Sequence, residues 1–230
     1  MMFGIPWDLS SEWAFAVSIL PILLRGLVVT VQATALGFVL ALVLGLVLAV
    51  LRSVPLKFVS WPTAVVIEFV RDTPLLVQLY FLYFVLPNFG IVLPAFLTGA
   101  IALGVQYSGY TSEVYRAGLE AVPRGQWEAS RALNLPAWLT YRDVVVPQAV
   151  PRIIPALGNY LVSMLKDTPL LSAVTVLEML GVAKIIGDRT FRYLTPLTMV
   201  GGLFLTMTLL SAWLVRFAER KLPKDGIPLK

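Results

Sequence analysis

The feature that most limits how this chain can fold is its long stretches without a charged residue. Residues 26–51, GLVVTVQATALGFVLALVLGLVLAVL, contain no Asp, Glu, Lys or Arg, and neither do residues 73–112. A helix that spans a membrane needs about 20 predominantly apolar residues. With 58% hydrophobic and 13% charged residues, the chain is also too apolar for a soluble globule. The sequence therefore predicts a membrane protein.

The apolar stretches predict an all-α, multi-pass membrane protein in which residues 1–230 form a single domain. A turn is expected at residues 86–94, LPNFGIVLP, where Pro, Asn and Gly occur together. A break near residues 166–169 is expected within a later span, with a shorter helix after it. About five transmembrane helices result: 26–51, two within 73–112, one within 144–183, and 193–215.

The distribution of Lys and Arg predicts the orientation, because cytoplasmic loops carry an excess of both. Arg52, Lys57, the five arginines between residues 116 and 152, and the basic C-terminal tail fall on one side of the predicted spans. The acidic N-terminal segment MMFGIPWDLSSEW falls on the other side and lacks the basic start of a cleavable signal peptide. The prediction is an N-terminus outside and a C-terminus inside, with the first apolar run retained. Four basic residues weaken the pattern without reversing it: Arg25, Lys184, Arg189 and Arg192.

Several function classes are excluded by what the sequence lacks. Without cysteine or histidine, the chain has no disulfide, zinc finger or Cys- or His-based catalysis, and we expect neither catalytic residues nor a metal site. There is no G-x-x-x-x-G-K-[ST] phosphate loop, so the chain has no ATPase site of the usual kind. The net charge of +5 comes mostly from residues that flank apolar runs, which argues against a nucleic-acid partner.

A six-residue phrase occurs twice, as RDTPLL at residues 71–76 and as KDTPLL at residues 166–171. Asp or Thr caps a helix, and Pro suits its first position, so each copy predicts a helix start inside a membrane-length stretch. Non-helical backbone at that depth is tolerated only inside protein or beside a watery cavity. We therefore expect broken helices at a solute pathway. The alternative is that each helix begins near the membrane surface, where Arg71 and Lys166 reach water.

Ionisable residues within membrane spans usually face an interior or a pathway. Glu113 has a helical i,i+3 partner in Arg116, so structural pairing is its alternative role. Glu68 has the same relation to Arg71, and there we prefer the structural role. The expected pathway residues combine the two phrases with polar and aromatic groups near the inferred core: Arg71, Asp72, Thr73, Gln106, Glu113, Asn159, Tyr160, Lys166, Asp167 and Thr168.

Residues 116–147, RAGLEAVPRGQWEASRALNLPAWLTYRDVVVP, differ from their surroundings. Glu128 lies in the first turn of a short predicted helix, where it favours the helix dipole and can pair with Arg131. Asn134 is expected to end this helix and Pro136 to start the next. Two short helices joined by a bend would form a compact docking knob. The alternative is an amphipathic hairpin on the membrane surface.

This segment resembles the EAA loop of binding-protein-dependent ABC importers. The resemblance lies in Glu128, Ala129, the small residue that follows, and the downstream proline. Asn134 stands where the usual pattern has Gly, and Asn tolerates the same left-handed backbone. In that family the loop forms coupling helices that fit a cleft on the ATP-hydrolysing subunit. The resemblance implies a coupling role for six residues: Gly125, Glu128, Ala129, Ala132, Asn134 and Pro147.

The resemblance extends over most of residues 60–200. FVRDTPLLVQLYFLYFVLP, VVVPQAVPRIIPALGNYLVSMLKDTPLLS and RYLTPLT are similar to polar amino acid permeases. This implies the MetI-like transmembrane domain of a type I ABC importer in a prokaryotic inner membrane. The implied partners are the lipid bilayer, two ATPase subunits that bind ATP and Mg, a second permease subunit, identical or similar, and an extracytoplasmic solute-binding protein. The chain itself is expected to bind no cofactor.

Within that branch, YRAGLEAVPRGQWEASRALNLP and GNYLVSMLKDTPLLSAVTVLEML look closest to the ectoine and hydroxyectoine permeases. Tyr160 stands where several relatives that move cationic amino acids carry an acid. A solute with one carboxylate and one delocalised cation fits Arg71, Asp167 and the aromatic residues. We therefore expect uptake of a small zwitterion such as ectoine. The alternatives are a permease for arginine, histidine, glutamine or glutamate and, from another class, an ion-coupled secondary carrier, because such carriers also contain paired broken helices.

Overall fold

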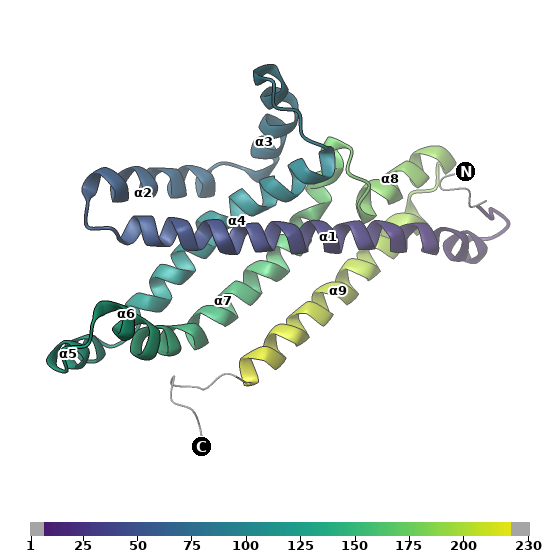
Figure 1. Ribbon diagram of the computed structural model, residues 1–230. Coiled ribbons are helices and arrows are strands. Elements are labelled where there is room, and N and C mark those ends of the chain that lie inside the picture. Colours follow the sequence, from purple (N-terminus) through teal and green to yellow (C-terminus); the bar gives the residue numbers. More distant parts are fainter. Residues whose placement is uncertain (1–6, 222–230) are drawn as a thin grey trace.

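The computed structural model describes residues 7–221, and all regular secondary structure in this range is helical (Figure 1). The all-α expectation is therefore confirmed. The α-helices are α1 (Glu12–Ser53), α2 (Lys57–Asp72), α3 (Leu75–Tyr80), α4 (Ala95–Glu120), α5 (Arg124–Ala132), α6 (Ala137–Leu139), α7 (Val146–Asp167), α8 (Met179–Thr190) and α9 (Leu194–Arg220). Residues 1–6 of the acidic N-terminal segment and residues 222–230 of the basic C-terminal tail lie outside the described residues.

Helix α1 contains the predicted span at 26–51 but is much longer, with 42 residues. The Ser11 side chain caps its N-terminus by accepting a hydrogen bond from the backbone N–H of Ala14 at 3.0 Å. Its C-terminus is set by Val54, whose backbone is extended because Pro55 follows it. At 1.5 Å per residue, α1 is about 63 Å long. It runs along the whole molecule (Figure 1).

A row of small residues allows α1 to pack closely on α4 and α8. Gly37 lies against Leu103 and the backbone of Ala100, and Gly26 lies against the backbone of Met179. Without larger side chains the helix backbones approach each other directly. Close dispersion contacts then hold the helices together, because the hydrophobic effect does not drive helix association within lipid. The buried small residues of α1 follow one another at intervals of three or four: Gly26, Thr30, Ala33, Gly37, Ala41, Gly45 and Ala49.

The first copy of the repeated phrase breaks a helix, as predicted. Helix α2 ends at Asp72, and Thr73 and Pro74 are extended before α3 begins, with a bend of 100° between the two helical segments. Helix α3 continues through a π-helical turn at Phe81–Val85 and a 3₁₀ turn at Leu86–Phe89. The predicted turn at 86–94 is confirmed, because the 3₁₀ turn ends at Gly90 in a left-handed conformation with φ of 80°.

The second copy does not start a separate helix, so that part of the prediction is wrong. Helix α7 passes directly into a 3₁₀ segment at Thr168–Val174. Pro169 has no N–H for the carbonyl of Leu165, and the Thr168 hydroxyl donates to that carbonyl instead, at 2.8 Å. The backbone therefore changes from an α-helix to a 3₁₀-helix without an extended break. The 47° change of direction comes later, after the left-handed Thr175, and the predicted shorter helix follows as α8.

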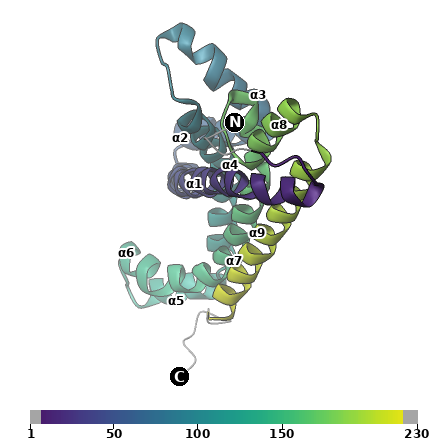
Figure 2. The ribbon, with the colours of Figure 1, turned by 90° about the vertical axis from the view of Figure 1, so that its right-hand side faces the viewer.

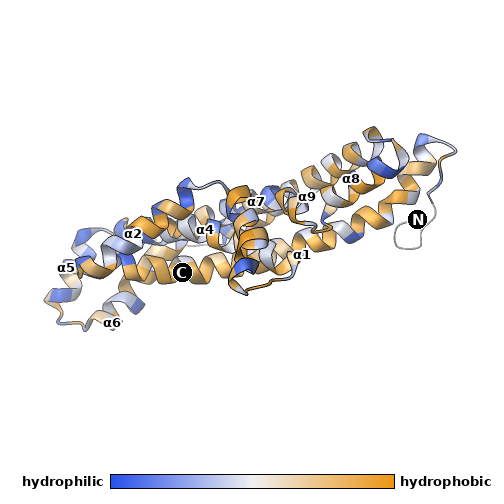
Figure 3. Cartoon of the chain, turned by 90° about the horizontal axis from the view of Figure 1, so that it is seen from above, coloured by the Kyte–Doolittle hydropathy of each residue, from blue (hydrophilic) through white to orange (hydrophobic). Residues whose placement is uncertain are grey.

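Within residues 7–221, two helices, α1 and α9, can cross a membrane by length and composition, or up to four spans result if each bent pair counts as one. Helix α4 is long enough, with 26 residues, but is polar in its middle and packs against α1, α2 and α7. A helix buried by its neighbours need not present an apolar surface to lipid. The count of five spans and the orientation stay predictions. Figure 3 shows apolar residues along much of α1 and α9, and hydrophilic ones gathered at the end that carries α5 and α6.

Candidate functional site

The middle of α4 carries three polar side chains, of which Gln106 faces α3 and Tyr107 and Tyr110 face α7. Gln106 and Tyr107 are 6% and 4% exposed. The Tyr107 hydroxyl donates a hydrogen bond to Oδ2 of Asp167, at the C-terminus of α7, at 2.7 Å. Tyr160 of α7 packs its ring edge-on to Tyr107 and stacks on Tyr110, with 5.4 Å between the stacked ring centroids. Tyr107, Tyr110 and Tyr160 together form what we call the tyrosine cluster.

The tyrosine cluster lies between charges of opposite sign. Asp167 borders it through Tyr107, and the Arg71 guanidinium of α2 lies 5.5 Å from the centroid of the Tyr110 ring. A cation above an aromatic face is attracted by the negative charge of the ring face. One anion, one cation and three aromatic rings are thus brought together from α2, α4 and α7. This arrangement can hold a small molecule that carries both charges.

Side-chain amides hold the α2–α3 corner against this cluster. The side-chain amides of Gln78 in α3 and Gln106 in α4 lie 2.6 Å apart, and the Gln78 amide nitrogen lies 2.7 Å from the Thr73 hydroxyl. The same amide donates to the carbonyl of Val70 at 2.9 Å, one of the acceptors freed where α2 ends. Side chains of Gln78 and Thr73 therefore satisfy backbone carbonyls at the break.

A cavity of about 370 Å³ adjoins the tyrosine cluster between α4 and α7. Tyr110 and Tyr160 line one part of it, and Glu113 and Arg152 line another. Its volume lies in the range of small-molecule pockets. It extends from the cluster toward the end of α4 that leads into α5, with Glu113 and Arg152 as its charged residues.

The structure brings together part of the predicted pathway. Arg71, Gln106, Tyr160 and Asp167 meet at the tyrosine cluster, and Glu113 lines the adjoining cavity. Three predicted residues are exposed and lie outside these contacts: Asp72, Asn159 and Lys166. Two others have local backbone roles, since the hydroxyl of Thr73 bonds to the carbonyl of Phe69 and that of Thr168 to the carbonyl of Leu165.

Tyr110 was not among the predicted pathway residues. Its spacing was the available signal, because Tyr107, Tyr110 and Glu113 follow one another at intervals of three on one helix.

The two predicted ion pairs of this region have different outcomes. Arg116 pairs with Glu113 at 2.5 Å, as expected, and also with Glu120 at 2.8 Å. The expected pair of Glu68 with Arg71 is absent from the ion pairs of residues 7–221.

The loop at 116–147 projects from one end of the bundle (Figure 2). Helix α5 ends just before Asn134, whose φ of 50° is left-handed, and α6 begins directly after Pro136, as predicted. The second helix is not separate, because α6 continues through a π-helical segment at Thr140–Val145 into α7. Within the described chain, no ion pair joins Glu128 to Arg131, and that expectation is wrong.

The outer surface of α5 is open to a partner. Of the residues predicted to couple, Gly125, Glu128, Ala129, Ala132 and Asn134 are exposed, and Pro147 lies in the first turn of α7. The α5 segment is held against the following helix by an edge-on contact of Trp127 with Tyr141, with 5.3 Å between ring centroids. A Cβ added at Gly125 would meet no atom within 4 Å, so the packing of the chain does not require glycine there.

Comparison with known proteins gives consistent family matches. Residues 41–224 match the family described as "Binding-protein-dependent transport system inner membrane component". A probable amino-acid ABC transporter permease of Sinorhizobium fredii is 59% identical over 231 aligned positions that cover 100% of both chains. An L-cystine transport system permease of Bacillus subtilis is 36% identical over 81% of this chain and 77% of its own length. A putative glutamine transport system permease of Rickettsia conorii is 31% identical over 87% of this chain and 92% of its own.

Solved structures agree with the sequence matches. A crystal structure of an amino acid ABC transporter with histidines superposes with a TM-score of 0.85 and 36% identity, over 90% of this chain and 96% of the other. An inward-facing methionine ABC transporter superposes with a TM-score of 0.73 over 91% of this chain and 98% of the other. At 19% identity, the second likeness shows the fold alone. The predicted MetI-like fold is confirmed.

Proposed function

Because this chain belongs to the family of inner membrane components of binding-protein-dependent transport systems, we propose that it is the permease subunit of an ABC importer for a polar amino acid. The observation that carries the proposal is the family match over residues 41–224. As an inner membrane component, the chain is a transport subunit. Its lack of a phosphate loop supports dependence on a separate ATPase.

The choice of substrate follows the relatives and the tyrosine cluster. The relatives reported above are named for amino acids, cystine and glutamine, and none of them is named for ectoine. Their names favour the polar amino acid alternative over our first expectation of ectoine. In the cluster, Arg71 is suited to the carboxylate of an amino acid, and Asp167 with the tyrosine rings is suited to its ammonium group.

The proposed complex contains two ATPase subunits, a second permease subunit and an extracytoplasmic solute-binding protein. The matching family is named for its dependence on a binding protein, and the solved relatives are ABC transporters. ATP and Mg would bind the ATPase subunits. We infer that closure of the ATPase dimer pulls the two α5 loops together and switches the pathway from inward-open to outward-open. The exposed Glu128 and Ala129 support this role for α5.

Isothermal titration of the solute-binding protein tests the substrate. The ligands are arginine, histidine, glutamine, glutamate, ectoine and hydroxyectoine, each titrated into the same receptor preparation. We expect a polar amino acid to bind in the micromolar range. Binding of ectoine without any of the amino acids would overturn the amino acid proposal and restore the first expectation.

Co-purification with the ATPase tests the coupling role of α5. Glu128→Arg reverses the charge on the exposed face of α5, and we expect the variant to lose both the ATPase and uptake. The matched control is Glu219→Arg, which makes the same change on α9, outside the loop. A Glu128→Arg variant that keeps its ATPase and transports normally would contradict the role. Uptake driven by an ion gradient without ATP would favour the secondary carrier instead.

A further inference from the structure

A second cavity, lined mainly by charged side chains, lies on a neighbouring face of α4 and shares Glu113 with the one described above. Its volume is about 410 Å³, and it is bounded by the C-terminal parts of α1, α2 and α4. Three arginines and three glutamates line it, so its formal charges cancel: Arg52, Glu68, Arg71, Glu113, Arg116 and Glu120. A polar cavity with both signs of charge is matched by a ligand that carries both signs.

Only some of these charges neutralise one another. Arg116 is held by both Glu113 and Glu120. Glu68 and Arg71 enter no ion pair with the described residues, although both line the cavity. An unpaired carboxylate and an unpaired guanidinium on one wall can each form a charge-assisted hydrogen bond with a ligand.

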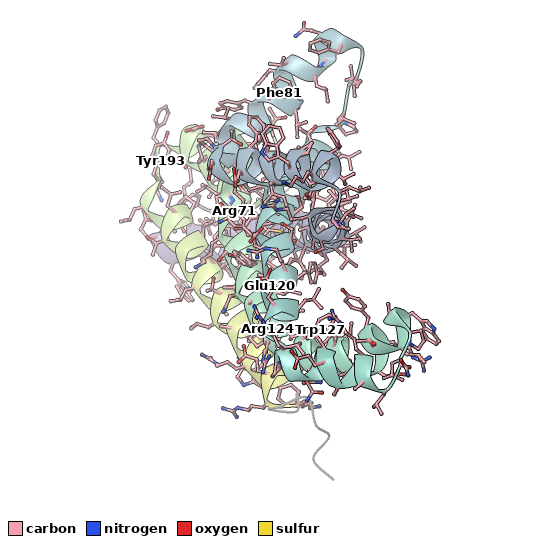
Figure 4. All side chains as sticks on the ribbon, turned by 90° about the vertical axis from the view of Figure 1, so that its left-hand side faces the viewer. Arg71, Phe81, Glu120, Arg124, Trp127 and Tyr193 are labelled. Carbon is pink, nitrogen blue, oxygen red and sulfur yellow. The ribbon has the colours of Figure 1, made fainter. Side chains whose placement is uncertain are left out.

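The charged cavity adjoins the tyrosine cluster through two shared residues. Arg71 lines the cavity, and its guanidinium also lies over the ring of Tyr110. Glu113 lines both this cavity and the one beneath Tyr110 and Tyr160. Figure 4 shows Arg71, Glu120 and the start of α5 at Arg124 one below another on the same side of the molecule. The cavity thus lies between the cluster and the end that carries α5.

We propose that this charged cavity is a second binding subsite for the zwitterionic solute, occupied as the solute leaves toward the α5 end. The inference rests on the proposed function, since it takes the same polar amino acid as its ligand. The carboxylate binds Arg71 and Arg52, and the ammonium group binds Glu68. Arg71 can leave Tyr110 and accompany the carboxylate, because its side chain reaches both places.

The subsite has a kinetic consequence. Solute that accumulates on the α5 side fills it by mass action and draws Arg71 away from the tyrosine cluster. The next solute molecule then meets a cluster without its cation, and uptake slows. Inhibition from the inside therefore reports occupancy of the charged cavity, whereas uptake into empty vesicles reports the transport pathway itself.

The test uses the complete complex in proteoliposomes, with ATP inside and the loaded solute-binding protein outside. The vesicles are preloaded with increasing concentrations of whichever amino acid among arginine, histidine, glutamine and glutamate is taken up. The measured quantity is the internal concentration that halves the initial uptake rate, relative to each variant's own rate in empty vesicles. We expect Glu68→Gln and Arg52→Gln each to raise this concentration about tenfold, equivalent to 1.4 kcal/mol of binding.

Two control variants remove charge outside the cavity: Lys57→Gln, near Arg52 in the sequence, and Glu219→Gln on α9. They should keep the wild-type value, and sucrose at the same osmolality should not inhibit. If internal amino acid fails to slow the wild type, or if Glu68→Gln and Arg52→Gln are inhibited like the controls, the subsite is refuted while the proposed function stands. If none of the four amino acids enters empty vesicles, the proposed function itself fails.

Discussion

Asp167 has a structural contact in the tyrosine cluster and a proposed role in transport. Its carboxylate accepts a hydrogen bond from a nearly buried hydroxyl, that of Tyr107, at 2.7 Å. It also lies at the junction where α7 tightens into the 3₁₀ segment at Thr168–Val174. The Tyr107 bond fixes the position of a negative charge beside three aromatic rings. A positively charged ammonium group is the complement of such a site.

Neutralising Asp167 should weaken transport more than folding. We expect Asp167→Asn to lower the kcat/KM of amino acid uptake at least tenfold, about 1.4 kcal/mol, because the amide keeps the shape but not the charge. Tyr107→Phe removes one hydrogen bond and leaves the charge in place, so its effect should be smaller. Radiolabelled uptake in proteoliposomes measures both variants. If Asp167→Asn took up the amino acid as well as the wild type, the carboxylate would not bind the solute.

At the scale of residues, the sequence predicts which kinds of side chain belong to the site better than it predicts which of them are in contact. Arg71 and Asp167 could be chosen because ionisable groups within membrane segments are costly. Tyr160 could be chosen because several similar permeases carry an acid at that position. Tyr110 could not be placed beside Arg71, which is 39 residues away, because that contact depends on how α2 crosses α4. Asn159 looked equivalent to Tyr160, but neighbouring residues on a helix point in different directions.

At the scale of elements, the contact of α1 with α4 depends on the absence of a side chain at Gly45. A Cβ at this position would lie 2.0 Å from Oγ1 of Thr111 and 3.0 Å from the carbonyl oxygen of Ser108. The Thr111 hydroxyl donates to the carbonyl of Ala41, which fixes it in place. The two helices can therefore approach only while residue 45 is glycine.

Replacing Gly45 with alanine should destabilise the fold. Overpacking typically costs about 1–3 kcal/mol, which exceeds the gain of about 0.5–1 kcal/mol from alanine in a helix. Gly201→Ala in α9 is the matched control, because open space surrounds that position and only the gain applies. Thermal unfolding in detergent should place Gly45→Ala below the wild type and Gly201→Ala at or above it. The opposite order would show that α1 can move away from α4 at little cost.

The repeated phrase shows why element boundaries could be predicted at one copy and not at the other. The two copies share Asp-Thr-Pro-Leu-Leu, yet only the first opens the helix. Gln78, four residues after Pro74, donates hydrogen bonds from its side-chain amide to the carbonyls of Val70 and Thr73 at the break. The corresponding residue after Pro169 is Ala173, which has no donor to offer. The outcome is decided by a residue outside the phrase, through a contact that sequence periodicity does not reveal.

At the scale of the whole molecule, orientation is the property most open to a direct test. The loop at 116–147 and the C-terminal end of α9 should face the cytoplasm, because both are basic. A C-terminal tag should then be digested by protease added to inside-out vesicles and protected in right-side-out vesicles. The same protease with detergent-opened vesicles controls for access. Protection in inside-out vesicles would reverse the orientation and place the α5 loop outside.

The length of α1 links this protein to the membrane around it. A helix of 42 residues, about 63 Å long, greatly exceeds a hydrocarbon core of about 30 Å. Such a helix can extend beyond the core or cross it obliquely, and a change in the thickness of the lipid layer alters the tilt that fits best. Since α4, α7, α8 and α9 all contact α1, a change in the tilt of α1 should also move α4 and α7, which carry the tyrosine cluster. Acyl-chain length should therefore tune the transport rate, with an optimum at the thickness that fits the resting tilt.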